Sequence, residues 1–133
     1  MQTIDLNPLL DSIRRGKIGI IGDFCLDVYW QINMAYSEIS VETKLPTRPV
    51  SQQSYSLGGA GNVATNLAAL GVEQVALFGV IGNDPFGQKM TALSKAWGLD
   101  TESLLTQEEN WNTHVYIKPF ENQQEGRRLD FGN

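Results

Sequence analysis

The sequence is poor in the residues that build disulfide frameworks and metal sites. It contains one cysteine, Cys25, and one histidine, His114, in 133 residues. A single cysteine excludes an intramolecular disulfide, and a histidine without cysteine or carboxylate neighbours at ligand spacing does not indicate a zinc site. We therefore expect Cys25 to pack as a small apolar group and His114 to lie on the surface of a strand.

Long apolar runs and an excess of basic charge are also missing. The longest mostly apolar stretch, 75–81, is far shorter than the roughly 20 residues needed to cross a bilayer. Ten Lys and Arg against fifteen Asp and Glu give a net charge of −5, which does not favour broad binding to nucleic acid or anionic membranes. With no stretch of secretory-signal type, we expect a cytoplasmic protein with neither nucleic acid nor membrane as a partner.

Strand and helix signals alternate along the chain. A length of 133 residues suits a single domain. The alternation predicts an α/β fold, with a parallel sheet and flanking helices. We expect the first helix to cover an edge of that sheet and the second, which is rich in Ala and Leu, to be buried. The predicted helices cover 5–15, 62–71 and 86–97, and the predicted core strands cover 17–21, 24–33 and 75–81.

Two polar segments interrupt the alternation. The segment 33–55 shows no helical period and is too long for an ordinary connection, so it predicts irregular chain with short strands. The segment 113–131 contains two strand-like runs, 113–118 and 127–131, around a polar turn. We expect the two segments to pair as a small antiparallel β lid.

A pair of glycines before the second helix is the first feature that carries chemistry. Gly58 and Gly59 allow the backbone to approach a ligand closely, and the first N–H groups of the helix are free to meet oxygen atoms. Asn62 adds a side chain that both donates and accepts hydrogen bonds. The pattern is neither a Walker loop nor a dinucleotide fingerprint, and a purely structural turn is the alternative interpretation.

Three motifs occur together in a fixed order. They read Gly-Asp-Phe-Cys-Leu-Asp at 22–27, Gly-Gly-Ala-Gly-Asn-Val-Ala at 58–64, and Gly-Val-Ile-Gly-Asn-Asp-Pro-Phe-Gly at 79–87. In this order and spacing they resemble the amino-terminal half of the ribokinase-like, or PfkB, carbohydrate kinases, from about residue 17 to the end. The run 22–30, with Arg-Leu-Asp-Phe at 128–131, is most similar to the heptose-7-phosphate kinase branch.

The resemblance implies a sugar pocket. Asp27 would be a carboxylate at a strand end that accepts hydrogen bonds from sugar hydroxyls, and Gly58, Gly59 and Asn62 would close around the same sugar. For Asp27 a structural turn is the alternative, and Asp23 stays open between a ligand contact and a loop hydrogen bond. The resemblance also implies that the lid covers the sugar and forms a homodimer.

A basic pair on a lid strand helps to hold the substrate phosphate in the heptose-phosphate branch. Here Tyr116 takes one of the two positions and Lys118 the other. Because a cation is replaced by Tyr116, the sequence leaves open whether the sugar carries a phosphate. Lys118 is the candidate partner of such a phosphate, with Arg127 and Arg128 as alternatives. For all three cations an ordinary solvated surface position is the competing interpretation.

The element that performs phosphoryl transfer in this family is missing. It is of Gly-Ala-Gly-Asp type, whereas residues 59–62 read Gly-Ala-Gly-Asn, and an amide cannot take a proton from a hydroxyl. Family members are more than twice this length, so the resemblance implies that ATP and Mg belong to the full-length parent, with none bound to this chain, which alone would be inactive. The alternative is a non-catalytic sugar-binding or dimerisation module. With part of the sheet missing, we expect uncovered apolar surface and self-association.

Overall fold

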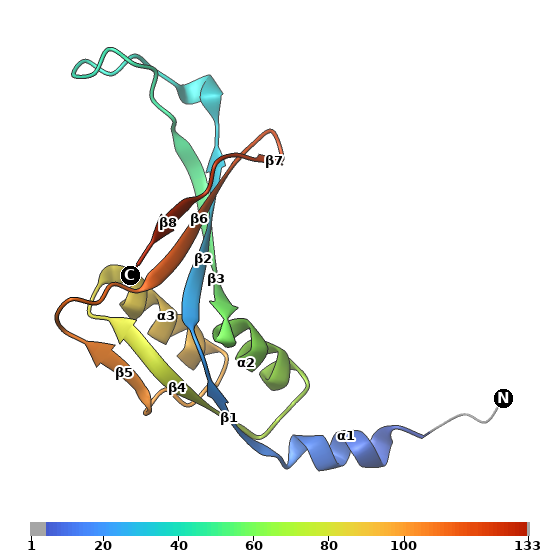
Figure 1. The fold of residues 1–133 in the computed structure, drawn as a ribbon. Helices are drawn as coiled ribbons and strands as arrows, with labels where there is room; N and C mark the ends of the chain where they lie inside the picture. Colours follow the sequence, from blue (N-terminus) through green and yellow to red (C-terminus); the bar gives the residue numbers. More distant parts are fainter. Residues whose placement is uncertain (1–4, 133) are drawn as a thin grey trace.

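The computed structural model describes residues 5–132, which form two sheets and three helices (Figure 1). One sheet has three parallel strands in the order β1-β4-β5; the other has five strands in the order β3-β2-β6-β7, with β8 also paired to β6. The strands are β1 (Lys17–Ile21), β2 (Phe24–Ile32), β3 (Val50–Gly59), β4 (Gln74–Gly82), β5 (Leu104–Gln107), β6 (His114–Glu121), β7 (Gln124–Glu125) and β8 (Leu129–Phe131). The helices are α1 (Asn7–Arg14), α2 (Ala60–Ala69) and α3 (Pro85–Ala96), with a short 3-10 turn at Met34–Tyr36.

The hydrophobic core lies between the parallel sheet and the helices α2 and α3. Successive side chains of a strand point to opposite faces, and β4 buries Val75, Leu77 and Ile81 on the helix side. Ala64 of α2 and Met90 of α3 are fully buried against the same cluster. This arrangement confirms the predicted α/β fold with flanking helices.

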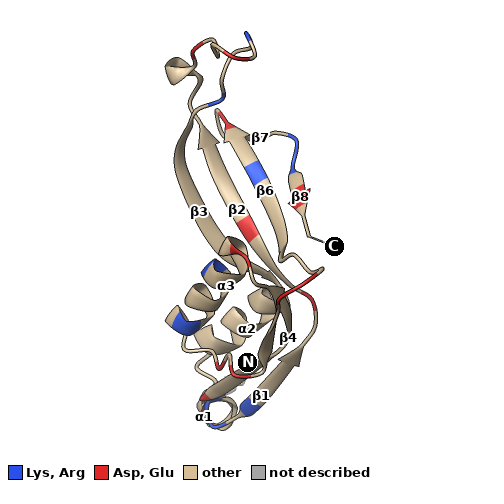
Figure 2. Ribbon diagram, turned by 90° about the vertical axis from the view of Figure 1, so that its left-hand side faces the viewer, with Lys and Arg blue, Asp and Glu red and all other residues tan. Residues whose placement is uncertain are grey.

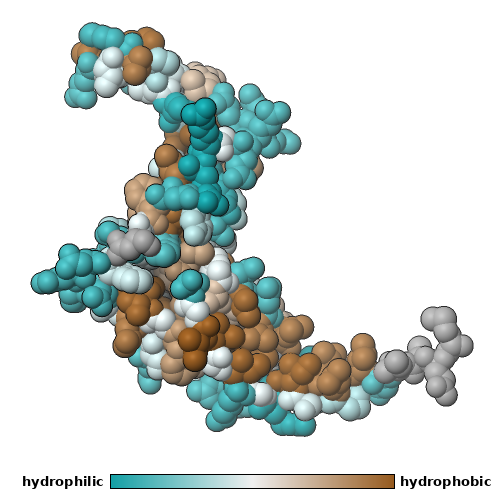
Figure 3. Space-filling model, viewed as in Figure 1, coloured by the Kyte–Doolittle hydropathy of each residue, from teal (hydrophilic) through white to brown (hydrophobic). Residues whose placement is uncertain are grey.

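The opposite face of the parallel sheet is open. Ile21 is 84% exposed, Leu105 63%, Phe78 40% and Val80 37%. Apolar side chains gather over this part of the molecule, whereas hydrophilic ones dominate its upper part (Figure 3). The prediction that 17–21 is a buried strand is therefore wrong for one of its faces, because helices cover only the other. The expected uncovered apolar surface is confirmed, and self-association stays a prediction.

The second sheet is larger and less regular than the antiparallel lid expected from the sequence. β2 and β3 are antiparallel, but β2 and β6 are parallel, so the sheet is mixed. β3 is one continuous strand of ten residues, because it pairs with β2 along almost its whole length. The prediction of irregular chain over 33–55 holds only as far as residue 49.

The helix boundaries differ from the prediction at two points. α2 begins at Ala60 rather than Asn62, because the backbone of Gly59 turns with φ +55° and the N–H of Ala60 donates to the carbonyl of Asp23 at 2.9 Å. α1 contains no buried residue and extends away from the rest of the chain (Figure 1). The expectation that it covers an edge of the sheet is therefore wrong, although Ile13 touches the core. Within 5–132, no helix combines the length and the apolar character that a membrane crossing requires.

We call the second sheet, β3-β2-β6-β7 with β8, the lid. The segment 34–47, which we call the arm, projects beyond it (Figure 1). At its base the N–H of Asn33 donates to the carbonyl of Pro49 at 3.0 Å. Its apolar side chains are bare, with Ile39 62%, Val41 82% and Leu45 65% exposed. The arm therefore keeps an apolar surface away from the core.

Candidate functional site

The two faces of β2 have different chemistry. Leu26 and Val28 are buried on the core side, whereas Cys25, Asp27 and Tyr29 alternate with them and share the other face. Asp27 is the fourth residue of β2, so it lies inside a strand and not at the strand end that the sequence motif suggested. Asp27 is the acidic residue of β2 and Lys118 the basic residue of β6. Figure 2 shows acidic colour on β2 and basic colour on the neighbouring β6.

Asp27 and Lys118 form the central contact of this face. The Nζ of Lys118 lies 2.8 Å from Oδ1 of Asp27, and the two side chains are 21% and 19% exposed. The parallel register sets Tyr29 opposite Lys118, whose ammonium lies 5.0 Å from the centroid of the Tyr29 ring. The hydrogen bond to Asp27 raises the pKa of Lys118, which therefore stays charged at neutral pH.

Gly58 brings β3 close to the same carboxylate. It pairs with Cys25, and a Cβ at Gly58 would lie 2.6 Å from Sγ of Cys25 and 3.0 Å from Oδ2 of Asp27. Any larger residue would therefore push the thiol or the carboxylate out of place. The thiol of Cys25 is buried, and burial first, then the charge of Asp27, raise its pKa, so it is no ready nucleophile.

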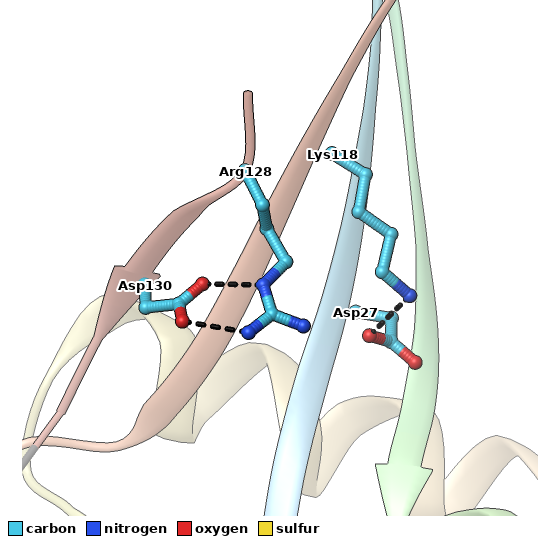
Figure 4. Close-up of polar contacts among 4 residues, drawn as sticks. All are labelled: Asp27, Lys118, Arg128 and Asp130. Atoms are coloured by element: carbon cyan, nitrogen blue, oxygen red, sulfur yellow. Dashed lines mark hydrogen bonds and ion pairs between the residues drawn. The ribbon is translucent and has the colours of Figure 1, made fainter. Parts of the chain in front are cut away.

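A second ion pair lies beside the first on the adjoining strands. The guanidinium of Arg128 donates to both carboxylate oxygens of Asp130, at 2.6 and 2.7 Å (Figure 4). Its central carbon lies 4.5 Å from the centroid of the Tyr116 ring, and Tyr116 is the register partner of both Asp27 and Asp130. Arg128 therefore shares the face of Asp27 and Lys118.

Arg127 lies elsewhere. It lines a depression of about 240 Å³ together with Trp30, Arg48 and Leu129. Trp30 alternates with Tyr29 along β2 and therefore belongs to the opposite face of the sheet. Of the two arginines considered as phosphate partners, the structure sets Arg128 beside Lys118 and Arg127 apart from it.

The remaining sequence-predicted residues surround the start of α2. Gly59 and Asp23 meet there, since a Cβ at Gly59 would collide with the carbonyl oxygen of Asp23. Asn62 lies exposed in the first turn of α2 and lines a separate depression of about 310 Å³ with Tyr55 and Trp97. The structure thus brings together Asp27, Lys118 and Gly58 and sets Asn62 over a different hollow.

His114 is more enclosed than a strand-surface residue. Its ring stacks on Trp111 at 6.0 Å between centroids and 13° between planes. Its Nε2 atom is buried and has no hydrogen-bond partner among the described residues. Both rings line a depression of about 290 Å³ that also includes Asp23.

Sequence reasoning missed the aromatic and edge-strand members of the site. Tyr29 could have been found from the period-two alternation that it shares with Asp27. Tyr116 was noted only as a replaced cation, and Arg128 only as an alternative. The pairing of β2 with β6 joins residues about ninety positions apart, and no local pattern announces it.

The assembled face offers two carboxylates, two cations and aromatic surface. A carboxylate accepts hydrogen bonds from two hydroxyl groups at once, and lysine and arginine are the usual partners of phosphate. Among residues 5–132, no group of three or more His, Cys, Asp or Glu is arranged to hold a metal ion. The arrangement suits a polyhydroxylated ligand that carries an anionic group.

Comparison with protein families gives one match that covers most of the chain. The model described as "pfkB family carbohydrate kinase" matches residues 25–126. This range includes the Asp27 strand, the Gly58 turn and Lys118.

Two curated relatives show how much of a longer protein the chain covers. A D-beta-D-heptose 7-phosphate kinase from Bordetella bronchiseptica is 35% identical over 121 residues, which are 91% of this chain and 37% of that protein. A bifunctional protein HldE from Hydrogenovibrio crunogenus is 34% identical over 124 residues, which are 93% of this chain and 25% of that protein. The chain therefore spans between a quarter and about two fifths of the length of these relatives.

Solved structures share the fold at lower identity. A carbohydrate kinase from Agrobacterium tumefaciens matches with a TM-score of 0.65 and 20% identity, over 86% of this chain and 35% of that one. A ribokinase from Thermotoga maritima matches with a TM-score of 0.62 and 18% identity, over 87% and 36%. The arrangement of strands and helices is thus one that sugar kinases contain.

Proposed function

Because this chain belongs to the pfkB family of carbohydrate kinases, we propose that it is the sugar-binding portion of an enzyme that transfers the γ-phosphate of ATP to a hydroxyl group of a sugar or sugar phosphate. The observation that carries the proposal is the polar face on which Asp27, Lys118 and Gly58 meet. Asp27 would accept hydrogen bonds from the sugar hydroxyls. The protein would act in the cytoplasm, where a single free cysteine stays reduced.

The transfer itself would need parts that these residues do not provide. The sequence has no Gly-Ala-Gly-Asp element, and residues 5–132 contain no set of His, Cys, Asp or Glu suited to a metal. In this proposal ATP and Mg would be bound by the full-length parent. In this proposal the chain alone binds sugar and transfers no phosphate.

The substrate class that the site favours is a sugar that already carries a phosphate. Lys118 and Arg128 lie on the face of Asp27, and each is engaged by one carboxylate only. A phosphate dianion would attract both cations, while the hydroxyl groups reach Asp27. The name of the Bordetella relative, a heptose 7-phosphate kinase, agrees with this choice.

A homodimer through the lid is the second part of the proposal. The arm carries bare apolar side chains next to Glu38 and Glu42. The depression on the far face of the lid combines Trp30 with the cations Arg48 and Arg127. In this proposal the apolar side chains of one copy's arm would pack into the depression on another copy's lid. Glu38 and Glu42 would then lie near Arg127 and near Arg48, which also pairs with Glu121 of its own chain at 3.4 Å.

Calorimetric titration of the chain with heptose 7-phosphate tests the site. Asp27→Asn keeps the size of the side chain and removes its charge, so we expect the affinity to fall at least about tenfold, since a hydrogen bond to a charged acceptor contributes roughly 1.5–3 kcal/mol. Asp11→Asn, an exposed change in α1, is the control and should bind normally. Equal affinity of Asp27→Asn and the unaltered protein would remove Asp27 from the site.

The competing function is a non-catalytic sugar-binding or dimerisation module. The favouring observation is that the contact between Asp27 and Lys118 and the arm both lie within residues 5–132. The downstream reading frame separates the two, since a Gly-Ala-Gly-Asp element there supports the kinase. A stop codon after residue 133, with a folded product that binds sugar, supports the module.

A further inference from the structure

We propose that Lys118 is a specificity-determining gate: it occupies Asp27 in the empty site and releases it when an anionic group of the substrate becomes its new partner. The proposal rests on the proposed function and deepens it, because it makes the same ion pair responsible for the choice between neutral and phosphorylated sugars.

Lys118 engages one oxygen of the Asp27 carboxylate, and the strand β3 lies close to the other. Oδ1 lies 2.8 Å from Nζ of Lys118. Oδ2 faces the backbone of β3, where even a Cβ at Gly58 would come within 3.0 Å of it. A sugar hydroxyl that binds Oδ1 therefore competes with Lys118, and the closeness of β3 narrows the approach to Oδ2.

The ammonium group of Lys118 can move away from Asp27. Among the described residues its ammonium pairs with one carboxylate, and in the same position it lies 5.0 Å from the centroid of the Tyr29 ring. Its side chain is partly exposed and has a flexible four-carbon stem. The ammonium can thus turn from Asp27 toward a ligand without any movement of the backbone.

The consequences differ for the two kinds of sugar. A neutral sugar that takes Asp27 leaves a partly buried ammonium without its counter-charge, which opposes binding. A phosphate gives the ammonium a stronger, doubly charged partner, and Asp27 is then free for the hydroxyls. Specificity here comes from a penalty on the wrong ligand as well as from attraction to the right one.

The test compares Lys118→Met with the unaltered chain in calorimetric titrations with heptose 7-phosphate and with the unphosphorylated heptose. Methionine keeps much of the apolar stem and removes the charge. We expect heptose 7-phosphate to bind at least about tenfold more weakly and the neutral heptose to bind severalfold more tightly. Lys89→Met is the matched control, because Lys89 lies 4.7 Å from the Tyr55 ring centroid on the other face of the sheet.

The affinity for the neutral heptose decides between roles. A gate predicts that this affinity rises when Lys118 is replaced. If it is unchanged, Lys118 is a simple phosphate contact, and if it falls, Lys118 only holds Asp27 in position; either result overturns the gate.

A measurement without sugar separates the gate from the proposed function. The NMR signal of the Asp27 carboxyl carbon, assigned with Asp27→Asn, should shift when inorganic phosphate is titrated into the unaltered chain and should not shift in Lys118→Met. A signal that ignores phosphate in the unaltered chain overturns the gate, whatever sugar binds. A signal that responds while neither heptose binds supports the gate and contradicts the sugar site.

Discussion

At the scale of single residues, Gly58 sets how closely β3 approaches the candidate site. We predict that Gly58→Ala weakens the binding of heptose 7-phosphate by at least about tenfold, because the new methyl group would displace Cys25 or Asp27. Calorimetry measures the loss. The double variant Gly58→Ala with Cys25→Ala removes the closest collision and should recover part of the affinity.

The control for that experiment is Gly98→Ala. Gly98 has φ +71° but no heavy atom within 4 Å of its Cβ position, so alanine there costs about 1 kcal/mol of stability and leaves binding unchanged. Weaker sugar binding in both alanine variants, by similar factors, would trace the effect of Gly58→Ala to general destabilisation.

Asp84 is the residue that fastens α3 to the start of β6. Its Oδ1 accepts hydrogen bonds from the N–H groups of Phe86 and Gly87 at 2.9 and 2.8 Å, and its Oδ2 accepts one from Thr113 at 2.8 Å. Burial by itself raises the pKa of Asp84, but these hydrogen bonds outweigh it and hold the pKa below its ordinary value of 3.8. The link to Thr113 joins residues 29 positions apart, so no local sequence pattern indicates it.

We predict that Asp84→Ala lowers the free energy of unfolding by about 2 kcal/mol at neutral pH, since a helix cap and a charged hydrogen bond are lost together. The unfolded chain binds the proton first as the pH falls below about 3.8. The contribution of Asp84 is therefore complete above that pH and is lost as the pH falls through the lower folded-state pKa. Urea unfolding at several pH values measures the contribution, with Asp11→Ala as an exposed control. A difference in unfolding free energy between the unaltered protein and Asp84→Ala that grows as the pH falls would contradict the prediction.

At the residue scale, the sequence motifs named residues that the fold brings together, whereas their role in sugar binding stays a prediction. Asp27, Gly58 and Lys118 were all identified before their contact was known, and the contact joins them in one place. The position of Asp27 within its strand was wrong, because the motif does not show where pairing begins. Arg128 could not be chosen over Arg127, since the choice depends on which face of β8 meets Tyr116.

At the scale of elements, the arm is a separable unit. Its base is closed by the hydrogen bond between Asn33 and Pro49, and its tip residues lie outside the core. We predict that replacing residues 36–47 by an Asn-Gly turn leaves the unfolding transition within about 1 kcal/mol of the original and abolishes the dimer. Sedimentation velocity and urea unfolding check the two halves of this prediction.

A charge reversal refines the test of the arm. Arg48→Glu on the far face of the lid should weaken the dimer in the same way, and a second change, Glu42→Arg, should restore part of it if the two charges meet across the interface. A dimer that survives the loss of the arm would assign association to another surface.

Element-scale prediction failed mainly where pairing is non-local. The helix α3 and the strand β4 were predicted from local patterns, because such patterns extend over a few neighbouring residues. β3 was not recognised as one strand, because its Ser- and Gln-rich sequence has weak strand propensity and its pairing with β2 makes it regular. α1 was correctly expected as a helix but not as an element without buried residues.

At the scale of the whole molecule, the parallel sheet is covered by helices on one face only. Sheets of this kind normally bury both faces, and here the apolar side chains of β1, β4 and β5 remain exposed on the second. The chain spans 37% of the Bordetella relative and 25% of the Hydrogenovibrio relative, so those proteins have ample further chain. In the isolated chain, this open face is a surface through which copies can associate without a specific geometry.

Association through this face should differ from association through the arm. We predict that the triple variant Ile21→Thr, Val80→Thr and Leu105→Thr reduces the concentration-dependent growth of large species, because threonine keeps strand propensity and removes apolar surface. The arm variant should remove a discrete dimer and leave that growth unchanged. Sedimentation velocity over a wide concentration range distinguishes the two, since a dimer saturates and open-ended association does not. If the triple variant aggregates as strongly as the unaltered chain, the exposed sheet face is not the cause.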